Sequence, residues 1–398
     1  MSNTQNNTIS IFLPVETLRD ALTLIANAVN TRSQIPIYSH VYCRISPQGI
    51  RFSTCDGEAI EQRVAVPFSD NVSAECYNVG GDPVSDVGFT VPHKKLLDIL
   101  KEFDSNLVAA LSSDRKTNKA KLKVSGYRSS YSFLGLDETL YPSLDIDAPQ
   151  TKAVISASNL LKLMTPIEGS MANNDVRYYL NGINLEKTGK DFFATATDGH
   201  RLSFNQVQAS DASDVDARCT VPRLAYKAIP VFLKSMTSEA NVVVAITDNH
   251  IVLKGEKKTF TSKLIDAKYP DARQVIPKQN SIIVEINRAA LLNACKRTAI
   301  LALEKFRGVT LGFSNDNPDA LVIKSENKTK EKASEEVIIH RMEGLNSPLE
   351  IGLNVDYLIN ALTSLNDEVI TIKLRDAESP ALVHGESALL HVIMPMRT

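Results

Sequence analysis

The sequence has 398 residues, of which 43% are hydrophobic and 23% charged, and it contains no tryptophan. This composition is typical of a soluble globular protein, and the length exceeds what one ordinary core supports, so we expect two or three domains. No apolar run reaches the roughly 20 residues of a membrane-spanning helix. The polar first ten residues lack the basic and apolar regions of a secretion signal, so we expect a cytoplasmic protein without a membrane partner.

The cysteine and histidine spacing predicts neither a disulfide framework nor a metal site. The seven histidines form no HExxH or HxxH pair, and the five cysteines are far apart in the sequence: Cys43, Cys55, Cys76, Cys219 and Cys295. A phosphate-binding or dinucleotide-binding glycine motif is also missing. We therefore expect reduced, mostly buried cysteines and no cofactor.

Two amphipathic helix patterns recur in each third of the chain, and each is followed by segments that alternate like strands. The helical patterns cover residues 16–30, 93–103, 158–169, 223–237, 287–301 and 354–366. The strand patterns include residues 37–45, 179–185, 241–246, 250–254 and 309–313. Pro230 lies inside the fourth helical pattern, where we expect it to kink or restart the helix.

Short motifs recur at similar intervals. Thr-Cys-Asp-Gly at residues 54–57 matches Thr-Asp-Gly at 197–199, and Tyr-Pro at 141–142 matches Tyr-Pro at 269–270. The chain therefore resembles three copies of one domain, each made of two helix-plus-strands halves. We expect domains at residues 1–149, 150–279 and 280–398. Because helices alternate with runs of antiparallel strands, the expected class is α+β.

The charge is distributed unevenly over these elements. The six helical patterns together carry +5, which leaves −7 for the remainder of a chain whose net charge is −2. A positive helical layer fits a polyanion that approaches from the helix side. The alternative is a random scatter of charge over solvated helices.

Four segments carry the strongest functional signal. An Asp-Gly turn at 198–199, with a histidine and an arginine at its exit, follows a strand-like run at 193–197. The other segments are Asp175 to Gly182, which we expect to open a strand, Tyr269 to Arg273, and His391 to Thr398. Together they resemble the bacterial DNA polymerase III β subunits, the sliding clamps.

The resemblance implies a non-catalytic processivity factor in DNA replication. Two subunits of three clamp domains each would form a homodimeric ring, with helices lining the hole and antiparallel sheets outside. The ring would encircle double-stranded DNA without sequence preference, and it would tether replicative and other DNA polymerases. Polymerase and clamp-loader subunits would bind through short peptide motifs.

The resemblance also implies three sets of contact residues. The DNA contacts would be Arg32, Asn174, Tyr178, Tyr179, Arg223 and Lys227. The dimer would join Tyr131 and Phe133 on one edge strand to Ile300 and Leu301, far along the chain, in a head-to-tail contact. The partner-peptide cleft would contain Leu180, Thr197, Gly199, His200, Arg201, Leu202, Pro270, Gln274, Val275, Asn354, Tyr357, Val392, Ile393, Met394, Pro395, Met396 and Arg397.

The residue types in the cleft and on the DNA surface suit these roles. Met394 and Met396 offer adaptable apolar surface, and Pro395 keeps that edge from pairing further. Arg223 and Lys227 are one helical turn apart, so they share a face that could meet phosphates.

Most of these assignments have a plain structural alternative. Arg32 could be a cation that complements the end of the first helix. The C-terminal segment could be a terminal edge strand, and His200 a hydrogen-bonded turn residue. The four dimer candidates could belong to the core. Because Tyr178 and Tyr179 alternate on an expected strand, one of them could be core while the other faces out.

Several positions depart from the usual pattern of the family. Residues 69–90 form an insertion that contains Gly, Asp and Ser, and Gln274 stands where an arginine is expected at the cleft. Glu378 and Pro380 alter a neighbouring loop, and Thr398 replaces a more usual apolar residue.

Two rival functions are open to test. A phosphodiesterase could use Asp198, His200 and a metal, but it would need further carboxylate or histidine ligands, and the sequence offers no convincing set. A non-catalytic interaction protein of clamp fold without a DNA-tethering role is the second rival.

Overall fold

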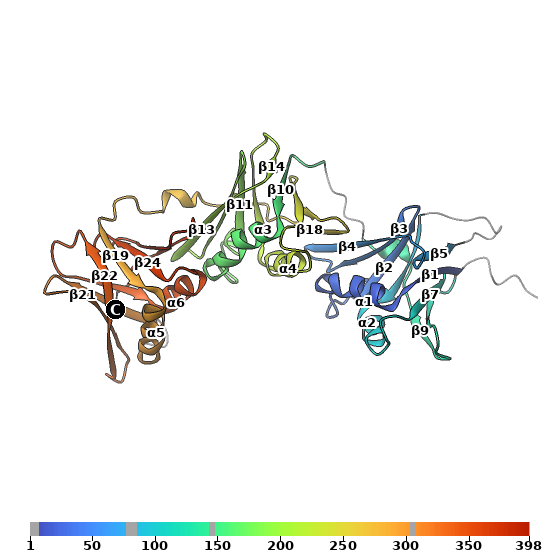
Figure 1. Cartoon of the computed structure of the whole chain (residues 1–398), viewed down its shortest axis with the longest axis horizontal. Coiled ribbons are helices and arrows are strands. Elements are labelled where there is room, and N and C mark those ends of the chain that lie inside the picture. Colours follow the sequence, from blue (N-terminus) through green and yellow to red (C-terminus); the bar gives the residue numbers. More distant parts are fainter. Residues whose placement is uncertain (1–7, 77–85, 143–147, 303–306, 398) are drawn as a thin grey trace, which may run out of the picture. The chain divides into compact units, whose positions relative to one another are not determined.

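The computed structural model describes residues 8–76, 86–142, 148–302 and 307–397 (Figure 1). Within them the chain combines helices with antiparallel sheets, which confirms the α+β class. The α-helices of the described residues are α1 Val15–Leu24, α2 His93–Lys101, α3 Ala157–Met164, α4 Arg223–Lys234, α5 Arg288–Thr298 and α6 Val355–Ser364.

Each helix begins within one residue of the start that the apolar periodicity predicts, but it ends before the predicted end. Three of them finish in 3-10 turns: η1 Ala26–Ala28 after α1, η4 Thr165–Ser170 after α3 and η7 Ala299–Leu301 after α5. The expected restart at Pro230 is wrong, because α4 continues through this residue. Ile229, Phe232 and Leu233 are buried around Pro230, and this apolar packing offsets the single backbone hydrogen bond that a proline removes.

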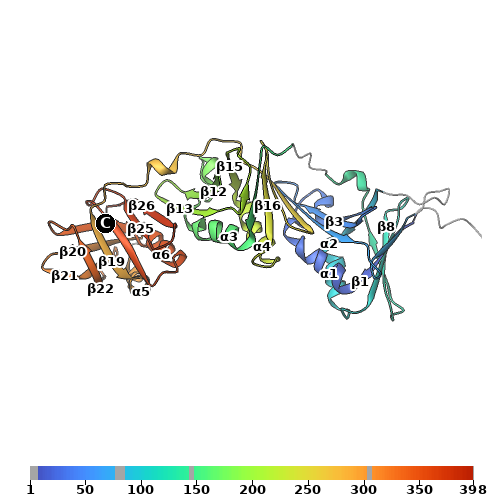
Figure 2. The same cartoon turned by 45° about the horizontal axis from the view of Figure 1, so that its top comes forward.

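The chain divides into two compact units, of which the first comprises residues 1–157 and 227–264. It contains a five-stranded sheet in the order β5-β1-β7-β8-β9 and a second sheet in which β10-β16-β17-β18-β4-β3-β2-β6 are successive neighbours. The strands are β1 Thr8–Pro14, β2 His40–Ser46, β3 Gly49–Cys55, β4 Ile60–Pro67, β5 Ser73–Cys76, β6 Val87–Pro92, β7 Val108–Asp114, β8 Lys119–Val124, β9 Ser130–Leu134, β10 Thr151–Ser156, β16 Asn241–Ile246, β17 His250–Lys254 and β18 Lys258–Lys263. Helices α1 and α2 lie side by side and bury Leu18, Leu22, Leu96 and Leu100 in one core (Figure 2).

The second unit comprises residues 158–226 and 265–398. Its twelve-stranded sheet has the order β15-β11-β12-β13-β26-β25-β24-β19-β22-β21-β20-β23. The strands are β11 Gly182–Thr188, β12 Asp191–Thr197, β13 Arg201–Gln208, β15 Ala217–Pro222, β19 Ile282–Asn287, β20 Gly308–Ser314, β21 Asn317–Glu326, β22 Lys332–Glu343, β23 Leu349–Asn354, β24 Val369–Leu374, β25 Ala381–His384 and β26 Leu390–Ile393; the short strand β14 covers Asp211–Ala212. Helices α5 and α6 pack against each other in this unit (Figure 1).

The strand registers show how closely the first two repeats agree. Tyr42 pairs with Ser53 across β2 and β3, and Asn184 pairs with Thr195 at the corresponding place across β11 and β12. The turn that follows is one residue longer in the first repeat than in the second, because Cys55 pairs with Glu61 whereas Thr197 pairs with Leu202. Glu61 therefore occupies in the first repeat the register position that Leu202 occupies in the second.

The predicted insertion at 69–90 begins and ends in regular structure. β5 pairs with β1 and β6 pairs with β2, so both flanks belong to sheets. Residues 77–85 lie outside the described residues, as do Asp147 near the first expected domain boundary and Thr398.

All five cysteines are buried and unbridged, as expected from their spacing. Burial raises the pKa of their thiols, to about 11 at Cys55 and about 12 at Cys219. Among the described helices, none combines the length and the apolar character that crossing a membrane requires.

Candidate functional site

The Asp-Gly turn between β12 and β13 is rigidly built. Thr197 Oγ1 donates to the carbonyl of Arg201 at 2.6 Å and accepts from the amide of Gly199 at 3.1 Å. Asp198 Oδ1 accepts from the amides of His200 and Arg201 at 2.9 and 3.1 Å. Gly199 has a φ of +88°, which favours glycine. The turn thus fixes the backbone of His200 and leaves its imidazole exposed.

The C-terminal segment is fastened to this turn. In the β13–β26 ladder Leu202 pairs with Val392, and beyond it the amide of Met394 donates to the carbonyl of His200 at 2.9 Å. The amide of Met396 then donates to Gly352 at 2.9 Å. β26 lies between β13 and β25, so the alternative of a terminal edge strand is wrong.

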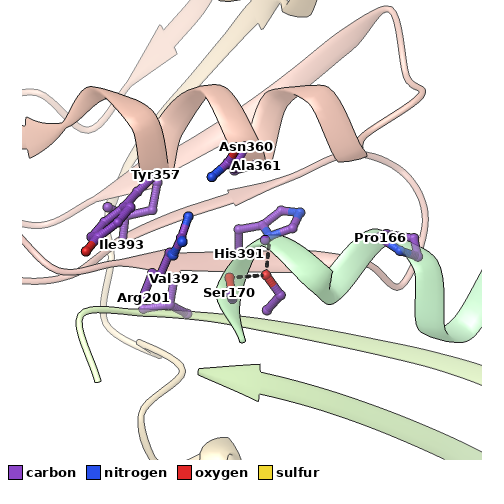
Figure 3. A pocket seen from close by; sticks show the side chains of 11 residues that line it. Pro166, Ser170, Arg201, Tyr357, Asn360, Ala361, His391, Val392 and Ile393 are labelled. Carbon is purple, nitrogen blue, oxygen red and sulfur yellow. Dashed lines mark hydrogen bonds between the residues drawn. The ribbon is translucent and has the colours of Figure 1, made fainter. Parts of the chain in front are cut away.

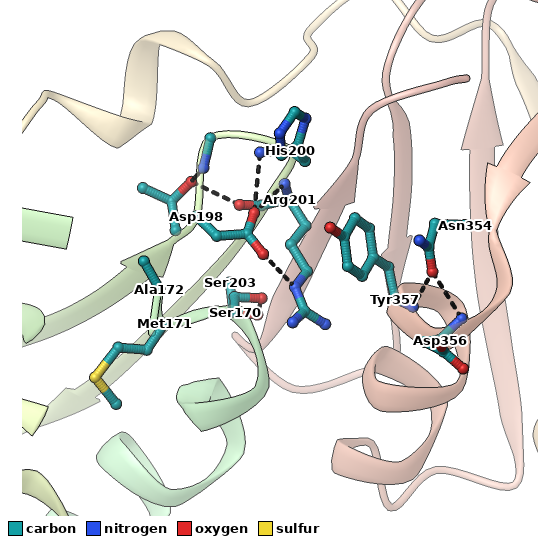
Figure 4. A network of polar contacts seen from close by, with 12 residues as sticks. Ser170, Met171, Ala172, Asp198, His200, Arg201, Ser203, Asn354, Asp356 and Tyr357 are labelled. Carbon is teal, nitrogen blue, oxygen red and sulfur yellow. Dashed lines mark hydrogen bonds and ion pairs between the residues drawn. The ribbon is translucent and has the colours of Figure 1, made fainter. Parts of the chain in front are cut away.

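Arg201 connects the turn to helix α6 (Figure 4). Its Nε donates to Asp198 Oδ2 at 2.9 Å, and its guanidinium carbon lies 4.1 Å from the centre of the Tyr357 ring. Asn354 caps α6, because its Oδ1 accepts from the amides of Asp356 and Tyr357 at 2.9 and 3.3 Å. Asn354 therefore has a structural role besides any contact with a partner.

The segment after Tyr269 forms another side of the site. The Tyr269 hydroxyl accepts from the amide of Thr197 at 3.0 Å, and its ring is buried with Leu180 and Ala172. Arg218 Nη2 donates to the carbonyls of Tyr269 and Pro270 at 3.1 and 3.0 Å. These bonds hold the segment in place.

Further along this segment, Arg273 lies 4.8 Å above the Phe193 ring and pairs with Glu186. Gln274 and Val275 follow it in the chain. Both are exposed, and Gln274 Nε2 donates to Asp271 Oδ2 at 3.2 Å.

A chain of buried hydrogen bonds lies beside Arg201 (Figure 3). Ser170 Oγ and Ser203 Oγ are 2.6 Å apart, and Ser203 Oγ lies 2.7 Å from His391 Nδ1. His391 Nε2 lies 2.8 Å from Ser364 Oγ, which donates to the carbonyl of Ala361. Ser364 therefore accepts from Nε2–H, and Nδ1 accepts from Ser203. Burial, assisted by the charge of Arg201, lowers the pKa of His391 to about 4, so the ring is neutral at pH 7.

Ser170, Ser203 and Ser364 carry no functional signal in the sequence, and His391 stands out there only as the first residue of the C-terminal segment. Strand alternation places Ser203 and His391 on the opposite face from Leu202 and Val392. Nothing in the sequence, however, indicates that two residues 188 positions apart form a hydrogen bond.

The predicted cleft residues all belong to the second unit, and they divide by exposure. Leu180, Leu202, Val392 and Ile393 are buried; Leu202 and Val392 pack in one apolar cluster, whereas Leu180 packs with Ala172 and Tyr269 in another. The others are exposed or half-buried: Thr197, Gly199, His200, Arg201, Pro270, Gln274, Val275, Asn354, Tyr357, Met394, Pro395, Met396 and Arg397.

The prediction of a strand through Tyr178 and Tyr179 is wrong. Tyr178–Leu180 is a 3-10 turn, and β11 begins only at Gly182. Asn181 closes the preceding loop by two hydrogen bonds with the Asp175 backbone, at 2.9 and 2.8 Å, and this closure competes with strand pairing. Tyr178 is 58% exposed, whereas Tyr179 is half-buried against the Leu180 cluster.

Asn174 and Arg177 belong to the same loop. Asn174 is exposed and has a φ of +57°, a conformation that asparagine tolerates. Hydrogen bonds from Arg177 lower the pKa of Asp175 to about 2. Arg177 Nη2 also donates to the carbonyl of Asp198 at 2.9 Å, so the loop is tied to the Asp-Gly turn.

The predicted DNA-binding cations differ in availability. Arg223 is half-buried, and its guanidinium donates to the carbonyls of Met171 and Ala172 at 2.8 to 3.1 Å. Lys227 is exposed. Arg32 is also exposed, but α1 ends at Leu24, so the reading of Arg32 as a cation at the end of that helix is wrong.

The dimer candidates also divide by exposure. Phe133 belongs to the core of its own unit, and Tyr131 packs partly against that core. Ile300 is 77% exposed, and Leu301 is half-buried. Leu134, which the sequence analysis missed, is 67% exposed on β9, an edge strand of the five-stranded sheet. Unlike Phe133, it leaves a large apolar side chain exposed on this edge.

The geometry disfavours the phosphodiesterase reading. Both carboxylate oxygens of Asp198 are already engaged by His200 and Arg201. Within the described ranges, His, Cys, Asp and Glu side chains form no group of three that could hold a metal ion.

Comparison with known proteins identifies the family. Models of the DNA polymerase III beta subunit match its N-terminal domain at residues 10–145, its central domain at 154–271 and its C-terminal domain at 273–397. The beta sliding clamp of Pseudomonas aeruginosa is 33% identical over 386 residues, which cover 96% of this chain and 98% of that protein. The chain belongs to this family of sliding clamps. It is accordingly a DNA clamp and a non-catalytic processivity factor of DNA replication, which confirms the family resemblance.

Other similar proteins and solved structures are also sliding clamps. The Escherichia coli beta sliding clamp is 31% identical over 311 residues, covering 77% of this chain and 81% of that protein. A solved P. aeruginosa clamp with 31% identity matches with a TM-score of 0.88 over 98% of this chain and 100% of its own. Another structure of that clamp, bound to griselimycin, gives a TM-score of 0.87 at the same identity and coverage.

Proposed function

We propose that two copies of this chain close into a ring around duplex DNA and tether polymerases to it. Each copy would contribute three domains, at residues 1–149, 150–279 and 280–398, and the three consecutive family matches support this division. The clamp would act in the bacterial cytoplasm. Its effect is topological, because a tethered polymerase has a high effective concentration at its template.

The charge of the helices supports DNA as the encircled partner. With the observed bounds, the six α-helices carry +7 in a chain of net charge −2. The exposed cations include Lys94, Lys95, Lys162, Lys227 and Lys234. We expect Lys227 and Arg32 to meet phosphates, Tyr178 and Asn174 to approach DNA from their loop, and Arg223 mainly to hold that loop. Tyr179 would support Tyr178, since their rings pack edge to face at 6.0 Å.

Binding to DNA is expected to depend on the topology of the DNA. Phosphate contacts are sequence-independent and weaken with salt, so affinity for a short linear duplex should be low and should fall steeply as salt rises. After loading by an ATP-driven loader, the clamp should stay on a nicked circular plasmid through gel filtration. Cutting the plasmid should release it.

Two outcomes would contradict the ring. One is tight, sequence-selective binding to a short linear duplex, and the other is equal retention before and after the cut. A protein that is never retained on circular DNA would favour the rival function, a clamp-fold interaction protein without a DNA role.

We further propose that polymerase and clamp-loader peptides bind at the cleft defined above. The observation that carries this proposal is the β13–β26 junction, where the buried pair Leu202 and Val392 adjoins the accessible apolar surface of Met394, Pro395 and Met396. Apolar anchors of a peptide would settle there, with Val275 and Pro270 opposite. Griselimycin, the ligand of the P. aeruginosa clamp structure, would compete for the same cleft.

The first repeat explains why we propose one apolar cleft per chain. Glu61 stands at the register position of Leu202. It is buried, and the guanidinium of the half-buried Arg63 donates to it at 2.8 and 2.7 Å. Its partner on β18 is Thr261, where β26 supplies Val392. An apolar peptide anchor would lie against a buried carboxylate and its half-buried arginine there, so the corresponding position is unfavourable.

Replacing Gln274 with arginine is expected to strengthen chiefly the binding of acidic peptides. The rim position is exposed, so the added charge should contribute about 0.2–1 kcal/mol, or up to about fivefold in affinity. Fluorescence anisotropy at low and high salt can compare a peptide carrying an aspartate with its asparagine counterpart. An equal gain for both peptides, or a gain that salt leaves unchanged, would refute the assignment of Gln274 to the rim.

A further inference from the structure

Helix α6 is held against the β13–β26 ladder at two points. Near its start, Tyr357 stacks on Arg201, with 4.1 Å between the guanidinium carbon and the ring centre. At its end, Ser364 accepts a hydrogen bond of 2.8 Å from His391. Tyr357 and Ser364 are seven residues apart, about two turns, so they lie on one face of the helix.

His391 connects the second of these points to the rest of the site. Its Nδ1 accepts from Ser203 on β13 at 2.7 Å, and Ser203 is bonded to Ser170 in η4 at 2.6 Å. These hydrogen bonds join η4, β13, β26 and α6 in one network. The His391 side chain is buried, and it points away from the apolar pair Leu202 and Val392.

The network lies beside the cleft rather than in it. Ser170, Ser203 and His391 line a narrow crevice together with Arg201 and Tyr357 (Figure 3). A peptide that contacts the exposed Met394 and the rim would not reach His391. Any effect of His391 on binding must therefore pass through the position of α6 and of Tyr357.

We propose that His391, through Ser203 and Ser364, is a positioning residue that sets the place of α6 and thereby of Tyr357 and Arg201 in the peptide cleft. The proposal rests on the function proposed above, since it concerns the same peptide site. A phenyl ring at this position would fill a similar volume, but it would remove the bonds that join Ser203 and Ser364, and each serine would keep only its other partner, Ser170 or the carbonyl of Ala361.

The test compares peptide affinities by fluorescence anisotropy with a labelled polymerase-tail peptide. His391→Phe should weaken binding about tenfold or more. Ser364→Ala should weaken it about threefold to fivefold, and it should add little to His391→Phe because both remove the same bond. If His391→Phe fails to fold, Ser364→Ala and Ser203→Ala decide the question.

The matched control is His93, a histidine that is also buried, in α2 of the other unit, with its Nε2 2.8 Å from the carbonyl of Leu22. His93→Phe should lower the melting temperature without changing peptide affinity. Long-range nitrogen NMR should show His391 as the Nε2–H tautomer, and Ser364→Ala should shift that signal.

The outcomes are distinguishable. If the wild-type protein binds the peptide and folded His391→Phe or Ser364→Ala binds equally well, the positioning role is refuted. If His93→Phe weakens binding as much as His391→Phe, the effect is general destabilisation, and the proposal is also refuted. If the wild-type protein itself binds no peptide, the proposed cleft function fails instead.

Discussion

Deleting residues 394–398 is expected to abolish peptide binding while the protein stays folded and dimeric. The deletion removes the apolar surface of Met394, Pro395 and Met396 and the two backbone bonds that fix it to His200 and Gly352. Burying one leucine or phenylalanine contributes about 1.5–3 kcal/mol, so two anchors account for much of the about 8 kcal/mol of a micromolar complex. The expected loss is therefore a hundredfold or more.

Anisotropy with the polymerase-tail peptide measures this loss, and griselimycin displacement provides a second readout. β26 ends at Ile393, so the deletion leaves the β13–β26 ladder in place. Sedimentation and the melting temperature of the deletion variant serve as controls. Undiminished binding by the shortened, folded protein would show that the cleft has been assigned to the wrong residues.

Replacing Ile300 with aspartate is expected to convert the proposed dimer into monomers. Ile300 is 77% exposed in η7, and in the proposed ring it would be covered by the β9 edge strand of the other copy, where Leu134 is 67% exposed. Each lost aliphatic contact costs about 1.5–3 kcal/mol, and burying an unpaired carboxylate costs more. A ring has two such interfaces, which doubles the effect. Leu134→Asp should act in the same way, and alanine at both Ile300 and Leu301 should weaken the dimer less.

Sedimentation equilibrium over nanomolar to micromolar concentrations measures the change. Ile338 offers a matched control, since it is 75% exposed but lies on β22, an interior strand of the twelve-stranded sheet. Ile338→Asp should leave the dimer intact. A wild-type protein that sediments as a monomer at micromolar concentration, or an Ile300→Asp variant that dimerises normally, would disprove this interface.

Periodicity in the sequence predicted the helices and the repeated architecture well. Apolar spacing locates each helix because only one face of it is buried, as in α1 with Leu18 and Leu22. The ends are less predictable, since 3-10 turns such as η7 continue the same apolar spacing with a different hydrogen-bond pattern. The turn at 198–199 was also predictable, because an Asp-Gly pair favours the positive φ that Gly199 adopts.

The conformation of one loop and the facing of one edge strand were not predictable from local sequence. Tyr178 and Tyr179 have strong strand propensity, but a side chain–backbone closure by Asn181 decides their conformation. Phe133 and Leu134 are both large and apolar, and only the register of β9 shows which of them is buried. The proposed cleft rests on family resemblance, whereas the hydrogen-bond network beside it depends on tertiary contacts that a single sequence does not encode locally.

The interior place of β26 has a consequence for how the molecule is made. Ser203 on β13 leaves the ribosome 188 residues before His391, its neighbour in the sheet. At about 5–20 residues per second, β13 waits roughly 10–40 s with one backbone edge unpaired, and so does β25 for a shorter time. A nascent or prematurely terminated chain thus exposes unpaired strand edges that can pair with other chains, and it lacks the proposed peptide cleft. With the proposed cleft, only molecules translated through residue 396 would recruit a polymerase, so truncated products would not compete for replication partners.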